Sequence, residues 1–218
     1  MPQRIVPTAV VARIWRLYRT EAGVLLPAAL VLFAIELVLA LVLSHVVGVV
    51  LIVAFVLSLL YQGFVVELVA QARAGAPTTT QGDLVRAVTP ALGPLVLISI
   101  LYVVGVMIGF ILIIIPGLVL MTMWSVVVPV EVLEHRGVLG SFARSRHLVR
   151  GNGWRTFGVI VLVYVAVLVI SLLAAAVSAP LGYALRDVIQ WAVSVALTPV
   201  VALSASVLYF ELIDAGAG

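Results

Sequence analysis

Long hydrophobic runs alternate with short polar segments along this chain. Six of the runs are close to the roughly 20 residues that a helix needs to cross a bilayer core. They lie at about 24–45, 48–69, 94–115, 117–134, 156–179 and 188–212. The runs pair through short turns near residues 45 and 116, whereas the segments 70–93 and 135–155 are longer and basic. The pattern predicts an all-α membrane protein with six transmembrane helices in three hairpins.

Amphipathic, arginine-bearing segments precede the first, third and fifth runs. In residues 8–21, Val10 and Ile14 share one helical face while Arg13 and Arg16 lie on another, which predicts an interfacial helix. A plain polar flank ahead of the first span is the alternative. We interpret the chain as three copies of an interfacial helix plus a hairpin, with the interfacial helices on the cytoplasmic side. Chance similarity among hydrophobic segments is the competing explanation.

The composition supports a bilayer as the solvent. Hydrophobic residues make up 65% of the chain and charged residues only 10%, against about 25% charged residues in soluble domains. Residues 1–218 form one integral membrane domain on this interpretation. The chain has no cysteine, which excludes disulfides and thiolate metal sites.

The arginines are distributed unequally between the two sides of the predicted bundle. Eleven of the twelve basic residues, all of them arginines, fall in the N-terminal segment and the two long loops. Arg186 is alone on the opposite side. The excess of positive charge places both termini and both long loops in the cytoplasm.

Three glutamates, Glu67, Glu131 and Glu211, recur near the cytoplasmic ends of the even-numbered spans. An ionised carboxylate at that depth needs a partner, and interfacial arginines are close enough to supply one. We interpret the three as structural ion pairs that dock the interfacial helices. A proton or ion site is the alternative.

Glu36 differs because it lies near the middle of the first span. An intramembrane carboxyl is a candidate functional site. It either forms such a site together with Gln62, or it is protonated and hydrogen-bonded to Gln62, Ser125 or a tyrosine. Both interpretations stay open from the sequence.

No enzymatic constellation emerges from the motifs, and the sequence predicts neither a metal site nor a cofactor. The basic segments lie against the membrane, which favours lipid over nucleic acid. We expect anionic lipid headgroups to be the partners, with a protein partner or a second copy of the chain as the alternative. The predicted headgroup-binding residues are the arginines and tryptophans of these segments: Arg13, Trp15, Arg16, Arg144, Arg146, Arg150 and Trp154.

Several motifs resemble one family of bacterial membrane proteins. They are Ile115-Pro116-Gly117, the segment Ser141–Gly151 with its Arg-Ser-Arg, Trp154-Arg155-Thr156-Phe157, and the two ends of the chain. Together they resemble the glycerophosphoryl diester phosphodiesterase membrane domain and the YciC-like six-helix proteins. The resemblance implies a multi-pass protein of the bacterial inner membrane. It does not carry over phosphodiesterase activity, because the chain lacks the catalytic barrel to which some members are fused.

These observations favour a non-enzymatic scaffold or accessory protein that contacts anionic headgroups, or a partner, through its basic cytoplasmic loops. The alternative is a small transporter or lipid-handling protein with Glu36 in an intramembrane polar site.

Overall fold

The computed structural model describes residues 6–42, 46–75 and 81–216 of the chain, and their regular structure is helical throughout. The α-helices are α1 (Pro7–Val42), α2 (Val47–Ala74), α3 (Gln81–Val88), α4 (Leu92–Leu112), α5 (Ile114–Met123), α6 (Val127–Glu134), α7 (Gly137–Val149), α8 (Gly153–Ser178) and α9 (Tyr183–Gly216). Six helical segments are long and apolar enough to cross a membrane. The predicted all-α membrane fold with six spans is confirmed, and the chain is a polytopic membrane protein.

The first hairpin departs from the expected bounds. Residues 8–21 and the first span were predicted as separate elements, but α1 runs unbroken from Pro7 to Val42. Pro27 lies inside this helix without ending it, as prolines often do within the membrane. The amphipathic segment is therefore the first part of one long helix. The turn was predicted near residue 45; residues 43–45 lie outside the described residues, and α2 begins at Val47.

The second hairpin turns earlier than the Pro-Gly sequence suggests. The chain reverses at Ile113, whose backbone is extended, with φ −165° and ψ 150°. Pro116 lies in the first turn of α5, where its missing N–H leaves no hydrogen bond unmade. Gly117 supports the reversal by close packing, since a Cβ built on Gly109 of α4 would lie 2.9 Å from its Cα.

The predicted span 117–134 is broken in its middle. Helix α5 ends at Met123 and α6 begins at Val127, with a turn over Trp124–Val126 between them. Pro129 explains the break, because it cannot donate a hydrogen bond to the carbonyl of Ser125 and its ring clashes there. Non-helical backbone at membrane depth is tolerated where it is buried in protein or borders a polar cavity.

The two other amphipathic segments are separate short helices, α3 and α7. On α3 the buried side chains of Leu84 and Val88 lie one turn apart, while Asp83 and Arg86 are exposed. Both helices lead directly into a span, as the predicted units required.

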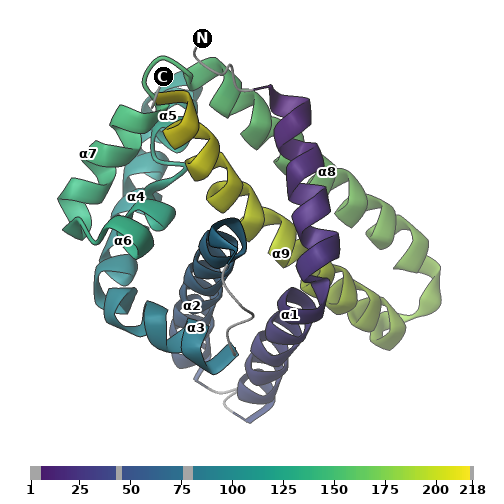
Figure 1. Cartoon of the computed structure of the whole chain (residues 1–218). Helices are drawn as coiled ribbons and strands as arrows, with labels where there is room; N and C mark the ends of the chain where they lie inside the picture. The colour runs from purple at the N-terminus through teal and green to yellow at the C-terminus, as the bar shows by residue number, and fades with distance from the viewer. Residues whose placement is uncertain (1–5, 43–45, 76–80, 217–218) are drawn as a thin grey trace.

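Helix α9 runs through the centre of the bundle and borders α1, α2, α6, α7 and α8 (Figure 1). The core between α1, α2 and α9 is built from fully buried aliphatic side chains that include Leu25, Val65 and Leu203. Helix α1 begins and α9 ends at one end of the molecule (Figure 1). We call this the basic end, because the arginines of α1, α2, α7 and early α8 lie there.

Candidate functional site

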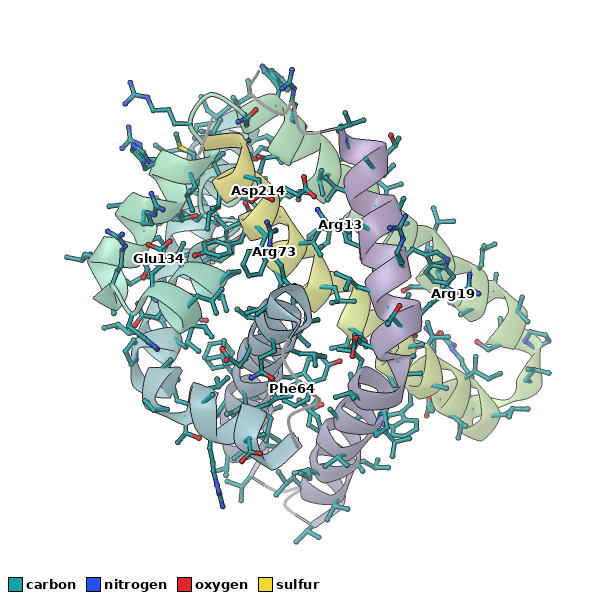
Figure 2. The ribbon with its side chains drawn as sticks, viewed as in Figure 1. Arg13, Arg19, Phe64, Arg73, Glu134 and Asp214 are labelled. Carbon is teal, nitrogen blue, oxygen red and sulfur yellow. The ribbon has the colours of Figure 1, made fainter. Side chains whose placement is uncertain are left out.

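Two ion pairs join the basic ends of α1 and α2 to α9. Arg13 pairs with Glu211, which is the kind of Glu–Arg contact that the sequence predicted. Arg73 pairs with Asp214, with its Nη2 2.6 Å from both carboxylate oxygens, and its guanidinium lies 4.9 Å from the ring centroid of Phe210. Figure 2 shows Arg13 and Arg73 beside the last turns of α9. These contacts close the end of the three-helix core.

Glu134, at the end of α6, accepts hydrogen bonds from three side chains. Its oxygens accept hydrogen bonds from Arg136 at 2.5 Å, from Arg144 at 3.1 Å and from the Tyr209 hydroxyl at 3.0 Å. The side chain is only 16% exposed. This cluster holds α6, α7 and α9 together.

Two of the three predicted ion pairs have different partners. Glu131 is 3% exposed and accepts a 2.6 Å hydrogen bond from the Ser141 hydroxyl of α7. Glu67 accepts a 3.3 Å hydrogen bond from Gln71, one turn along its own helix. The prediction was wrong for both: Glu131 meets a hydroxyl group of α7, and the partner of Glu67 is an amide group on its own helix. Glu131 nevertheless docks α7, through Ser141.

The predicted headgroup-binding residues separate into two groups. Arg13 and Arg144 belong to the internal ion pairs described above. Arg16, Arg146 and Arg150 are exposed and take no part in the ion pairs of residues 6–42, 46–75 and 81–216. Both predicted anchors are exposed as well, Trp15 by 57% and Trp154 by 87%.

A cavity of about 280 Å³ lies between α2, α4, α5, α6, α8 and α9. Its polar lining consists of Ser58, Gln62, Ser99, Tyr102, Trp124, Ser125, Tyr164 and Ser204. None of the described residues that line it is charged. Its α8 residues Val159 and Tyr164 lie about 9 and 16 Å along the axis from Gly153, at about 1.5 Å per residue. The cavity is therefore within the membrane, on the half nearer the basic end.

The broken helix borders this cavity. Trp124 and Ser125 belong to the turn between α5 and α6 and both line the cavity. The Ser125 hydroxyl is buried and has no hydrogen-bond partner among the described residues. Buried hydroxyls are nearly always paired, so this atom marks a place where a further polar group fits.

The predicted site of Glu36 with Gln62 is not assembled around this cavity. Gln62 lines it, but Glu36 does not. Glu36 lies on α1 and is partly buried. Leu32, one turn before it, is buried, whereas its neighbour Leu37 is exposed. Helix α1 packs on α9 there, as the 6.5 Å contact between the rings of Phe33 and Trp191 shows. The expected partnership was wrong because α1 contributes nothing to the cavity wall.

Sequence reasoning missed Glu134, Asp214 and Tyr209 as contact residues. Spacing carried a usable signal, since Glu134 follows Glu131 and Asp214 follows Glu211 by three residues, which puts each pair on one helical face. Ser125 was named only as a partner for Glu36, and the other serines of the cavity carried no signal, because single serines are frequent in transmembrane helices. Within the described residues, no group of three or more histidines and carboxylates could hold a metal ion.

The fold and the site define an all-α polytopic membrane protein with a charged end and an uncharged intramembrane cavity. No protein-family profile, no curated protein and no solved structure matches the chain.

Proposed function

We propose that this protein is a non-enzymatic membrane scaffold or accessory protein that binds anionic lipid headgroups at its basic end. One observation carries the proposal. The carboxylates Glu131, Glu134, Glu211 and Asp214 are all engaged with side chains of the protein. The first part of α1 and the junction of α7 and α8 both carry exposed arginines and an exposed tryptophan. The positive charge left at the surface is suited to phosphate groups of lipids.

The strongest part of this surface is the junction of α7 and α8. Arg146 and Arg150 end α7, and Trp154 lies in the first turn of α8. A tryptophan at a membrane interface sets the depth of the helix, and an arginine near an anionic surface contributes about 1 kcal/mol. Arg16 and Trp15 on α1 extend the surface. A soluble partner with an acidic surface would use the same groups.

The proposal includes the location. The excess of arginine at the basic end favours the cytoplasmic side for both termini, and the resemblance to the membrane domain of the glycerophosphoryl diester phosphodiesterases and to YciC-like proteins favours a bacterial inner membrane. The resemblance rests on sequence motifs alone and assigns no catalysis.

Tryptophan fluorescence provides a direct test. A variant that keeps only Trp154, with Trp15→Phe, Trp124→Phe and Trp191→Phe, is placed in phosphatidylcholine nanodiscs that contain a minor fraction of brominated lipid. Brominated phosphatidylglycerol should quench Trp154 more than brominated phosphatidylcholine at the same mole fraction. Arg146→Gln and Arg150→Gln should each reduce the preference by about fivefold, the equivalent of about 1 kcal/mol, and high salt should reduce it too.

Arg186→Gln is the matched control, because Arg186 is exposed at the opposite end. It should leave the preference unchanged. Equal quenching by the two lipids at low salt would contradict headgroup binding. If the preference for phosphatidylglycerol were unchanged by both Arg146→Gln and Arg150→Gln, these two arginines would not be headgroup-binding residues.

A second candidate is a transporter or lipid-handling protein, and the cavity is the observation that favours it. The polar residue in its binding site would be Gln62 and not Glu36, because only Gln62 lines the cavity. Because the chain has no cysteine, Gln62→Cys provides a unique thiol, with Leu25→Cys in the packed core as the control. Reaction of the first with a water-soluble maleimide would support a transport path, and protection of both would exclude a water-accessible one.

A further inference from the structure

We propose that the intramembrane cavity binds the uncharged, hydroxyl-bearing head of an amphiphile that enters from the bilayer. The inference rests on the second candidate function, that of a transporter or lipid-handling protein, because it uses the same cavity. It adds the chemical class of the ligand. It is independent of headgroup binding at the basic end, since Arg146 and Arg150 do not line the cavity.

The lining determines the charge of the ligand. Transfer of an ion to a low-dielectric site without a partner of opposite charge is strongly unfavourable. The described residues around the cavity offer hydroxyl, amide and indole groups and no ionised side chain. A carboxylate, phosphate or ammonium group would be uncompensated there, so the ligand is neutral.

The hydrogen-bonding groups determine its chemistry. The buried Ser125 hydroxyl has no partner, and the Gln62 amide offers both donors and an acceptor across the same space. The hydroxyls of Ser58 and Ser204 already donate to backbone carbonyls of their own helices, at 2.7 and 2.6 Å, and they can still accept. A hydroxyl group both donates and accepts, which satisfies such a mixed set. An ester or ether cannot donate.

The walls determine the route. Val103 of α4 and Tyr164 of α8 line the cavity and are 55% and 54% exposed on the bilayer-facing surface. On this side the cavity reaches the lipid, and an alkyl chain attached to the bound head can remain in the bilayer. The volume of about 280 Å³ accommodates the head and its first carbons, and the rest of the chain remains in the lipid.

The test uses Trp124 as the reporter, because it lines the cavity. The full chain with Trp15→Phe, Trp154→Phe and Trp191→Phe is placed in phosphatidylcholine nanodiscs. Dodecanol brominated on the carbon next to the hydroxyl-bearing one is titrated in. Dodecane brominated at the same carbon, the corresponding bromododecanoate, and a short water-soluble bromoalcohol are compared with it. Saturable quenching by the long-chain alcohol alone is the expected result.

Ser125→Ala and Gln62→Leu should each weaken that quenching by about three- to tenfold, the effect of one net hydrogen bond. Ser125→Ala removes an unpaired buried hydroxyl, so it should not lower the Tm of the ligand-free protein. This separates loss of binding from misfolding. Thr198→Ala on α9, outside the cavity, is the matched control, and it should leave the quenching unchanged.

The other arms decide between the remaining outcomes. Equal saturation by the short alcohol would support the hydroxyl chemistry but assign it to a small polar solute. Equal quenching by the alkane or the carboxylate, or wild-type affinity in both cavity variants, would overturn the inference. No saturable quenching by either alcohol would overturn it too. Reaction of the Gln62→Cys thiol would then show that the second candidate function survives without this ligand class.

Discussion

The hydroxyl of Tyr209 on α9 donates a 3.0 Å hydrogen bond to Glu134 on α6. The same carboxylate accepts a hydrogen bond from Arg144 of α7, so one acidic group joins the second hairpin, through α6, to α7 and to α9 of the third hairpin. Tyr209 is 3% exposed, and Leu208 beside it lines the intramembrane cavity. The contact therefore connects the charged end of the molecule to the wall of its cavity.

Tyr209→Phe tests this contact with almost no change in shape. We expect a loss of about 1.5 to 3 kcal/mol in the free energy of unfolding, since one hydrogen bond to a charged group disappears. Unfolding by sodium dodecyl sulfate in mixed micelles measures it. Tyr183→Phe, on a side chain 87% exposed at the opposite end, is the matched control and should have no effect. Equal stability of wild type and Tyr209→Phe would show that the contact contributes nothing.

Ser141→Ala should destabilise the docking of α7. The substitution removes the hydroxyl that donates to buried Glu131, and a carboxylate left unsatisfied costs about 1 to 3 kcal/mol. Glu131→Gln in the presence of Ser141 should cost less, because an amide oxygen still accepts the hydrogen bond. Hydrogen exchange of the α7 amides measures the local effect. Protection unchanged in Ser141→Ala would refute a docking role for the pair.

The ion pair of Arg73 with Asp214 should tolerate reversal better than single substitution. Both side chains are about one-third exposed, so solvent screening limits each single loss to about 0.5 to 1 kcal/mol. Arg73→Lys should keep most of the ion-pair energy, because one nitrogen of Arg73 lies 2.6 Å from both carboxylate oxygens and an ammonium group can take the same place. A double-mutant cycle with Arg73→Asp and Asp214→Arg measures the coupling. A coupling energy of zero would mean that the ion pair contributes nothing to stability.

Gly105 and Gly109 form a GxxxG sequence on α4. We expect it to pack helices of one chain against each other and not to join two chains. A Cβ on Gly105 would lie 2.6 Å from the Trp124 ring, and one on Gly109 would lie 2.9 Å from the Gly117 backbone. Overpacking of this kind costs about 1 to 3 kcal/mol, so Gly105→Ala and Gly109→Ala should both lower Tm. Gly93→Ala on the same helix is the control, because nothing lies within 4 Å of its Cβ. It should leave Tm unchanged or raise it. If the substitutions at Gly105 and Gly109 instead altered only the oligomeric state, the motif would serve association.

The candidate site was partly predictable from single residues. Trp15 and Trp154 were expected at an interface, and both are exposed at the basic end. Gln62 was expected in a polar intramembrane site, and it lines one. The expected partner of Gln62 was wrong, because none of the described residues that line the cavity belongs to α1. The pattern of hydrophobic and polar residues along the chain does not indicate which helices enclose a cavity.

The sequence by itself determined the number of crossings. This number follows from a property of contiguous segments, because the hydrophobicity of about 20 residues decides whether a helix can cross. Only the tertiary structure decided that Glu134 and not Glu67 meets an arginine, that α1 is one helix, and that the break at Trp124–Val126 borders a cavity. The physical reason is that hydrogen bonds and ion pairs act over about 3 Å. At that range, a partner 75 or 198 residues away along the chain is selected by the rotation and register of packed helices.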